Sequence, residues 1–358
     1  MDERDARRVS LRGWGGVAAM ATAVACALVA VFTVLLPLSH TASGDGSTGL
    51  GSGGVADGLQ TKATDCDPDK KGKEPERSLD PKGDQNGEAV KAIKDRGYLS
   101  VGVDQNSYRW GYRDPNKGLD KNGSAGEEKT SELEGFDIDL AHEIAGEILG
   151  DPGAIRFRAI PTNQRIPAIK SGQVDMVVRT MTISCDRLAD VDFSTAYFQT
   201  GQQVLAPRSS DITGYDKSLA GKRVCTAKGS TAEIALGDGR DEKHEIPSST
   251  DITTTVPNQL DCLVRLQLGE VDAVVTDGAL AASQAAQDPT VELKGKPFTT
   301  EYYGVAMKKG ADDLVRRVNQ VLEDYRGGGK NSGWQKSYDK WLEADLGPSS
   351  GPPAPKYK

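Results

Sequence analysis

The sequence has no cluster of histidines and cysteines that would suggest a metal site, and no basic run that would suggest a nucleic-acid site. It contains three histidines and five cysteines, and they form no cluster with the spacing of metal ligands. Lysine and arginine number 44 against 52 acidic residues, and no basic run is long enough to suggest nucleic-acid binding. We therefore expect no metal, no cofactor and no nucleic-acid partner. The length of 358 residues allows one large or two modest domains with real cores.

The N-terminal region contains one long run without a charge. Residues 17–36 are about twenty residues, enough to span a bilayer as a helix. Basic residues precede this run, so we expect residues 1–13 in the cytoplasm and residues 14–38 as a transmembrane signal anchor. A cleaved signal peptide and a lipid-modified Cys26 are the alternatives. The run is long for the first, and it continues well beyond Cys26, which does not suit the second.

The segments that flank the globular part have little to pack. Residues 39–88 are rich in Gly and Ser at first and in charge later, which predicts a flexible linker. Cys66 lies within it, and a lone cysteine in an exported polar segment usually has a partner. Residues 347–358 are rich in proline and are expected to form a disordered tail.

Apolar strands alternate with amphipathic helices in the rest of the chain. The first half reads as strands at 99–103, 155–160 and 174–178, with helices at 136–149 and 165–171. Near-continuous apolar strands of this kind predict a parallel sheet covered by helices. Residues 269–277 (GEVDAVVTD) then echo residues 172–180 (GQVDMVVRT), and we interpret the two halves as two lobes of one architecture.

A hydroxyl-rich turn and an arginine follow the strand at 174–178. Residues 180–184 (TMTIS) offer hydroxyl and backbone N–H groups, and Arg187 adds a bidentate guanidinium, which together suit a carboxylate. The alternative is an ordinary loop in which Arg187 pairs with a surface acid such as Asp190. Ligands of parallel sheets bind at the carboxyl ends of strands, where the loop at 104–108 also lies.

A second candidate anion site begins with Gly229, Ser230 and Thr231. These residues open a helix, and the free N–H groups of a helix start favour an anion. Ordinary N-capping by Ser230 or Thr231 is an equal alternative.

Taken together, these segments resemble the extracellular polar amino-acid binding proteins of ABC transporters, solute-binding protein family 3, of the glutamate or glutamine type. The resemblance covers about residues 89–346 and rests on LSVGVD, LEGFDIDLAHEIA, NQRIPAIKSGQVDMVV, TMTISCDR, VDFSTAY, LAGKRVCTAKGST, LGEVDAVVTD and YYGVAMKKG. It implies a two-lobed α/β fold of the periplasmic-binding-protein type II class, with parallel-rich sheets and helices on both faces. Lobe 1 would comprise residues 89–204 plus 297–346, and lobe 2 residues 205–296.

The resemblance also implies a site for a zwitterion. Arg187 would pair with the α-carboxylate of an amino acid, and Asp277 would take its α-ammonium. The alternative for Asp277 is an acid that caps the next helix. Further contacts to the carboxylate would come from Thr180, Thr182, Ser230 and Thr231.

Side-chain specificity is expected from two cations beside these turns. Arg179 precedes the turn at 180–184, and Lys228 precedes the Gly229 turn. Two cations favour an acidic ligand, so glutamate or aspartate is the first expectation, with glutamine or asparagine as the alternative. Arg179 could instead pair with Asp175 or Glu134 within lobe 1. The remaining ligand-contact candidates are Asp104 and Tyr108.

Four cysteines outside the anchor suggest two disulfides. Cys225 and Cys262 would join a strand to a helix in lobe 2. Cys66 and Cys185 would then join the linker to the mouth of the pocket. This pairing is a hypothesis, because four cysteines allow other connectivities.

Three functions are compatible with these features. A receptor would deliver an amino acid to an ABC permease, and a sensor would use the same site to signal through a membrane partner. An enzyme on this fold would need a general acid, for which Glu233 and Asp104 are candidates, but the zwitterion site argues against it. We expect a non-enzymatic, membrane-tethered extracellular binding protein that closes by hinge motion.

Overall fold

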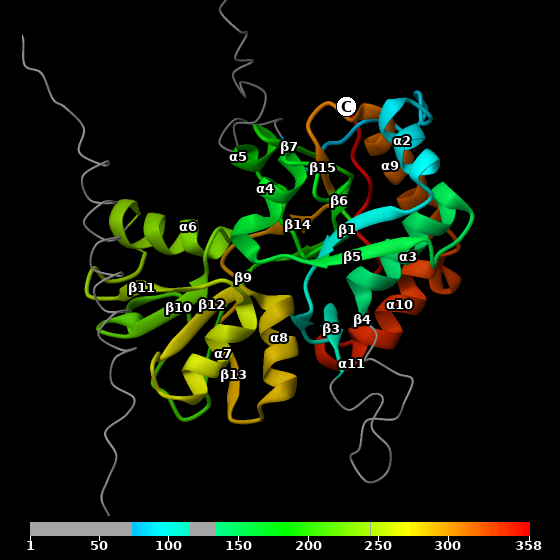
Figure 1. Ribbon diagram of the computed structural model, residues 1–358. Helices are drawn as coiled ribbons and strands as arrows, with labels where there is room; N and C mark the ends of the chain where they lie inside the picture. Colours follow the sequence, from blue (N-terminus) through cyan, green and yellow to red (C-terminus); the bar gives the residue numbers. More distant parts are fainter. Residues whose placement is uncertain (1–73, 115–132, 244) are drawn as a thin grey trace, which may run out of the picture. The chain divides into compact units, whose positions relative to one another are not determined.

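Figure 1 shows a computed structural model of the chain, which describes residues 74–114, 133–243 and 245–358. The chain divides into two units, Met1–Gln60 and Thr61–Lys358, and all described residues belong to the second. The expected anchor at 14–38 and the first part of the expected linker lie outside the described residues. Within the described ranges, no helix is both long enough and apolar enough to cross a membrane.

Lobe 1 is built on a five-stranded sheet of order β5-β1-β6-β15-β7. Strand β1 (Leu99–Val103) pairs in parallel with β5 (Ile155–Ala159) and with β6 (Met176–Val177). Strand β15 (Ala306–Lys308) lies antiparallel between β6 and β7 (Val191–Phe193). The sheet is therefore mixed, with its parallel part where the sequence predicts it.

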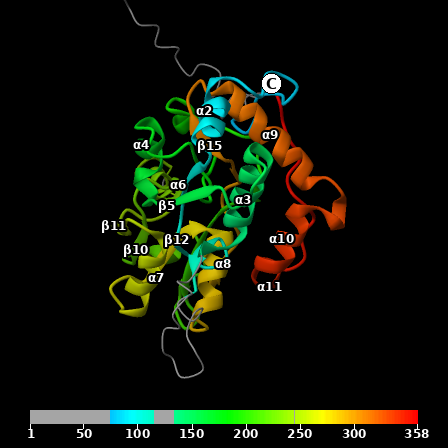
Figure 2. The same cartoon turned by 45° about the vertical axis from the view of Figure 1, so that its right-hand side comes forward.

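Helices cover both faces of this sheet, because neighbouring residues of a strand point to opposite faces. Met176 packs in the cluster with α3 (Phe136–Leu149) and α9 (Asp312–Arg326), whereas Val177 packs in the cluster with α4 (Arg165–Lys170). Helices α2 (Glu88–Arg96) and α10 (Gly333–Trp341) join the α3 side, and Figure 2 shows α3 and α9 next to each other there.

Lobe 2 is built on a second sheet, of order β11-β10-β12-β9-β13. Its parallel strands are β10 (Arg223–Ala227), β11 (Asp251–Val256) and β12 (Ala273–Asp277). Strand β9 (Gln202–Pro207) is antiparallel to β12 and to β13 (Val291–Lys294). Helix α6 (Thr231–Gly237) packs on one face, and α7 (Gln259–Gln267) and α8 (Gly278–Gln287) pack on the other.

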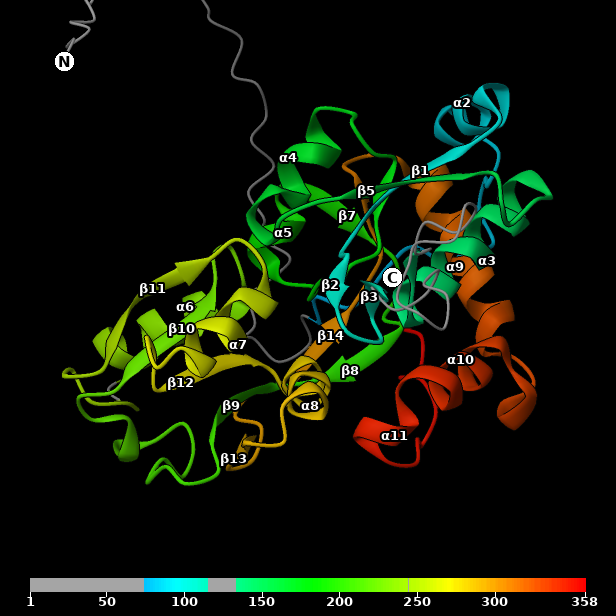
Figure 3. The same cartoon turned by 60° about the horizontal axis from the view of Figure 1, so that its bottom comes forward.

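Two strands connect the sheets. Strand β8 (Phe198–Thr200) pairs antiparallel with β14 (Glu301–Tyr303), and Figure 3 shows this pair lying between the two lobes. The chain runs from β8 into β9 of lobe 2, and it returns through β14 into β15 of lobe 1. This double connection is the arrangement that a hinge between two lobes needs.

Both flanking segments are held to lobe 1 where the structure describes them, contrary to the expectation of a disordered tail. Ser78 forms a parallel bridge with Tyr357. Lys356 Nζ contacts Glu74 at 2.5 Å and Glu76 at 2.7 Å, and the Tyr357 hydroxyl donates to Glu323 at 2.8 Å. The tail has no helix, and its order comes from partners far away in the sequence.

Asn319 on α9 anchors this flanking segment, and we expect its loss to be costly. It is fully buried, its amide nitrogen donates to Ser78 Oγ at 2.8 Å and to the Leu79 carbonyl at 2.7 Å, and its oxygen accepts from the Thr195 N–H at 2.8 Å. Asn319→Ala should lower the free energy of unfolding by about 2–4 kcal/mol, because buried polar groups lose their partners. Chemical denaturation measures this. The neighbouring Gln320 is half-buried and makes one exposed side-chain bond, to Asp324 at 3.1 Å. Gln320→Ala should change the free energy of unfolding by less than about 0.5 kcal/mol; equal effects of the two variants would contradict the anchor role.

Candidate functional site

A cavity of about 30 Å³ lies where the carboxyl ends of β1, β6, β10 and β12 face each other from the two lobes. This is the position that parallel sheets offer to ligands. Eight of the predicted ligand-contact residues line it: Asp104, Arg179, Thr180, Thr182, Arg187, Ser230, Thr231 and Asp277. The structure therefore brings together two turns and two strand ends that are distant in the sequence.

Arg187 points its guanidinium across the cavity towards lobe 2. It lies on the short helix α5 (Cys185–Leu188), where it is 8% exposed. Its Nη1 donates to the Thr182 carbonyl at 2.7 Å, and its Nη2 donates to the Gly229 carbonyl at 3.1 Å. Burial lowers the pKa of Arg187, and the nearby Glu301 opposes that shift. The alternative partner, Asp190, is bonded to Lys170 instead.

Gly229 provides the closest approach of lobe 2 to lobe 1 at this point. Its φ is +77°, a conformation that other residues rarely adopt, and an added Cβ would lie 3.0 Å from the Asn163 Cα of lobe 1. Its N–H donates to the Glu233 carboxylate at 2.6 Å, and Ser230 Oγ accepts from the Glu233 N–H at 3.1 Å. Ser230 is therefore the N-cap of α6, as the capping interpretation holds, and Glu233 bonds to the residue before the cap.

Thr180 has an unusual backbone conformation that a buried acid supports. Its φ is +40°, which is uncommon for a residue with a branched side chain. The Thr180 N–H donates to Asp137 Oδ2 at 2.9 Å, and the Tyr197 hydroxyl donates to the other oxygen at 2.8 Å. Burial raises the pKa of Asp137 to about 7. Asp137 therefore holds the hydroxyl turn in place from within lobe 1.

Arg179 is neutralised by Asp104. Its Nη2 lies 2.7 Å from Asp104 Oδ2, and both side chains are buried. Further bonds run to Thr162 Oγ1 at 3.0 Å and across the lobes to Asn258 Oδ1 at 3.4 Å. The Arg179 Nε is buried without a hydrogen-bond partner among the described residues. The expected alternative partner Asp175 is bonded to Arg96 instead.

Asp277 lies in a buried cluster with a second acid, Glu301, and only Asp277 was predicted from the sequence. Gln202 Nε2 donates to Asp277 and, at 3.0 Å, to Glu301. The Tyr303 hydroxyl donates to the other Asp277 oxygen. Burial, followed by the charge of Glu301, raises the pKa of Asp277 to about 8. Asp277 makes no side-chain cap to α8, so the capping alternative does not hold.

Glu301 joins the two lobes through hydroxyl groups. Its Oε2 accepts from Thr182 Oγ1 of lobe 1 at 2.6 Å and from Thr231 Oγ1 of lobe 2 at 2.9 Å. Glu301 is 7% exposed and Gln202 is 1% exposed. Glu301 begins the connecting strand β14, and Gln202 begins β9 directly after the connecting strand β8. Both were missed as site residues. A polar residue in a chain segment that passes between the lobes was the available signal.

Arg165 is a third cation at the cavity and was also missed. Its Nε donates to the Thr162 carbonyl at 2.9 Å, and its Nη2 donates to Gly229 at 3.4 Å. Burial, with the charges of Arg187 and Arg179, lowers its pKa well below the usual range. The sequence placed Arg165 at the start of a predicted helix and within a family motif, but no role at the site was expected for it.

Two predicted residues do not line the cavity. Lys228 follows β10 directly, and it is exposed and not among the residues that line the cavity. Tyr108 lies in a smaller neighbouring cavity with Gln259 and Gln284, and its ring packs against Tyr112 at 5.1 Å. Of the two cations expected near the pocket, Arg179 lines the cavity but is paired with Asp104, and Lys228 lies outside the lining.

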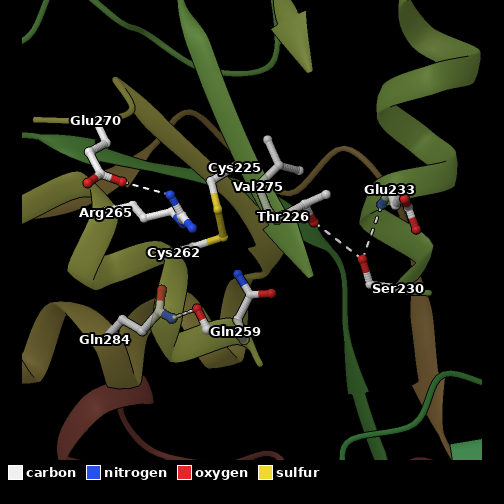
Figure 4. The surroundings of a disulfide bond; sticks show 10 residues. All are labelled: Cys225, Thr226, Ser230, Glu233, Gln259, Cys262, Arg265, Glu270, Val275 and Gln284. Carbon is white, nitrogen blue, oxygen red and sulfur yellow. Dashed lines mark hydrogen bonds and ion pairs between the residues drawn. A yellow bond between two sulfur atoms is a disulfide. The ribbon is translucent and has the colours of Figure 1, made fainter. Parts of the chain in front are cut away.

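The predicted disulfide between Cys225 and Cys262 is present, with an Sγ–Sγ distance of 2.01 Å. It joins β10 to α7, as Figure 4 shows. Cys185 is also in a disulfide. Cys66, its predicted partner, lies outside the described residues.

Comparisons with known proteins agree with this fold. The ABC transporter glutamine-binding protein GlnH of Bacillus subtilis (strain 168) is 33% identical over 268 residues, which are 73% of this chain and 89% of the relative. The glutamine-binding protein of Geobacillus stearothermophilus is 33% identical, covering 65% of this chain and 80% of the relative. A solved structure of an ancestral arginine-binding protein bound to glutamine has a TM-score of 0.57 at 33% identity, covering 71% of this chain and 99% of that one.

A sequence model of bacterial extracellular solute-binding proteins, family 3, matches residues 99–344, which contain the cavity and both sheets. The match spans the connecting strands and every residue that we placed at the cavity. The chain belongs to the bacterial extracellular solute-binding proteins, family 3.

Proposed function

We propose that the chain binds one polar amino acid between its lobes and delivers it to an ABC permease. The observation that carries this proposal is that the Arg187 fork and the buried acid Asp277 line one cavity. Glu301 is not a lining residue, but it bonds to the lining residues Gln202, Thr182 and Thr231. Groups of opposite charge at the two ends of a small cavity match the two ends of a zwitterion.

The ends of the ligand would have specific partners. The α-carboxylate would bind Arg187 and the hydroxyls of Thr182 and Thr231, which now serve Glu301. An ammonium group has three N–H donors. Asp277 and Glu301 would accept two of them, and Gln202 Oε1, which is buried without a partner among the described residues, would accept the third.

Charge balance favours glutamine over glutamate as the ligand. Arg179 is already paired with Asp104, and Lys228 is exposed outside the cavity. In the complex, where the ligand ammonium would hold Asp277 ionised, the formal charges of Arg165, Arg179 and Arg187 equal those of Asp104, Asp277 and Glu301. A ligand of zero net charge then keeps the balance. Glutamate would bring an extra buried charge, which is costly without a partner. The two relatives described above are also named glutamine-binding proteins.

We further propose that residues 14–38 hold the binding unit at the extracellular face of a membrane. The charge-free run and the basic residues before it support this proposal. The same anchor would suit a sensor that signals through a membrane partner. Capture of labelled glutamine by cells that carry the chain with and without a permease distinguishes these roles.

Thermal unfolding of the intact chain with each proteinogenic amino acid tests the proposed ligand. Glutamine should give the largest stabilisation, about 2.7 kcal/mol at a concentration about 100 times its Kd. Lys228→Ala should behave as the wild type, because Lys228 does not line the cavity. A larger effect of glutamate would contradict the charge-balance argument, and the absence of any effect would contradict amino-acid binding.

A further inference from the structure

Gln259 is a buried polar residue at the cavity to which nothing above gives a role. It is the first residue of α7, it is 6% exposed, and it lines both the main cavity and the neighbouring one that contains Tyr108. Its Nε2 has no hydrogen-bond partner among the described residues. Buried polar groups are nearly always bonded, so an unpartnered one at a ligand cavity indicates a bond that the ligand supplies.

A second buried donor approaches the same place from the other lobe. Arg179 Nε also has no partner among the described residues, and Arg179 Nη2 bonds to Asn258, the residue directly before Gln259. Arg179 follows β6 of lobe 1, whereas Gln259 begins α7 of lobe 2. One acceptor on a ligand could satisfy both donors only when the lobes are closed.

The position of Gln259 is fixed from two sides. Its backbone carbonyl accepts from Gln284 Nε2 of α8 at 3.0 Å. One turn later, Cys262 of the same helix is bonded to Cys225, two residues before the cavity-lining Ala227. Figure 4 shows Gln259, Gln284 and the disulfide together around the start of α7. A side chain held in this way is preorganised for recognition.

We propose that Gln259 selects the ligand side chain, by recognising a terminal carbonyl or amide group together with Arg179. The inference rests on the proposed amino-acid site and adds a residue that reads the side chain. An amide offers a donor and an acceptor and can exchange them by a half turn. Gln259 therefore suits a side-chain amide, whereas an apolar side chain would leave the Gln259 and Arg179 donors without partners.

Titration calorimetry of the intact chain with glutamine and with norleucine tests this role. Norleucine has a similar length and the same zwitterion but no polar end. Gln259→Leu should reduce the preference for glutamine over norleucine by about 10- to 100-fold, with norleucine affinity kept or raised. Gln259→Glu presents only acceptors, so it should weaken glutamate by a larger factor than glutamine. Gln267→Leu, on the exposed side of the same helix, is the matched control and should leave the preference unchanged.

The outcomes separate this inference from the proposed function. If the wild type binds no amino acid, the proposed function fails. If the wild type prefers glutamine and Gln259→Leu keeps that preference in full, the selector role is wrong while the proposed function stands. If Gln259→Leu does not fold, the ratio of glutamine to glutamate affinity in Gln259→Glu decides, and an unchanged ratio overturns the proposal.

Discussion

Replacing Arg187 by alanine should weaken the binding of every amino acid by about 100-fold or more, because a desolvated carboxylate would lose its bidentate partner. The effect should be the same for glutamine and glutamate, since Arg187 would contact the part that all amino acids share. We expect this large loss of affinity because the guanidinium is buried and bonds to Thr182 of lobe 1 and Gly229 of lobe 2. Titration calorimetry with both ligands measures the change.

Two further variants make this result specific. Arg187→Lys keeps the charge but loses the planar fork, so its affinity should lie between those of the wild type and Arg187→Ala. Arg223→Ala removes an arginine of β10 that pairs with Asp272 away from the cavity, and its affinity should equal that of the wild type. Wild-type binding by Arg187→Ala would overturn the site. A loss for one amino acid alone would place Arg187 at the ligand side chain instead.

Binding should release a proton from Asp277, so affinity should rise with pH. Burial and Glu301 raise the pKa of Asp277 to about 8, which keeps it largely protonated at neutral pH before binding. A ligand ammonium favours the ionised carboxylate and lowers this pKa in the complex. The complex then binds fewer protons than the free protein, so affinity increases with pH below about 8, by up to about tenfold per pH unit, and levels off above it.

Calorimetry in buffers of different ionisation enthalpy measures the released proton directly. Asp277→Asn cannot ionise, so it should show no release, should lose the pH dependence, and should bind about 10- to 100-fold more weakly. Gln202 and Tyr303 each donate to one oxygen of Asp277. An asparagine keeps one acceptor oxygen, so one of these two bonds must change direction in the variant. Glu301 and Arg187 are the charged groups that act on this position. A pH slope that survives in Asp277→Asn would assign the proton to another group, such as Asp137, whose pKa burial raises to about 7.

The parts of the site that lie close together in the sequence could be predicted. The turn from Thr180 to Arg187 carries its chemistry within a few residues, and apolar periodicity located the strands that position it. Arg179 shows the limit, because its partner Asp104 follows a different strand far earlier in the chain. Because the sequence does not show this partner, Arg179 was interpreted as a cation available to the ligand, and an acidic ligand was predicted.

Two of the site residues that were not predicted lie on or directly beside the connecting strands. Gln202 and Glu301 are about a hundred positions apart, and they meet only because β8 and β14 pair between the lobes. Local patterns report burial of apolar residues, but they do not report which polar residues are buried together. The order of the flanking segment at residues 78 and 79 was missed for the same reason, since its partner Asn319 lies about 240 positions later in the chain.

The most direct test of the zwitterion site is titration calorimetry of the intact chain with glutamine and two analogues. Glutaramate lacks the α-ammonium, and gamma-aminobutyramide lacks the α-carboxylate, but both keep the side-chain amide. We expect glutamine to bind tightly and each analogue to bind at least about 100-fold more weakly, because each leaves one buried charged group without its partner. Analogues that bind as tightly as glutamine would contradict the assignment of Arg187 and the Asp277–Glu301 pair to the two ends of an amino acid.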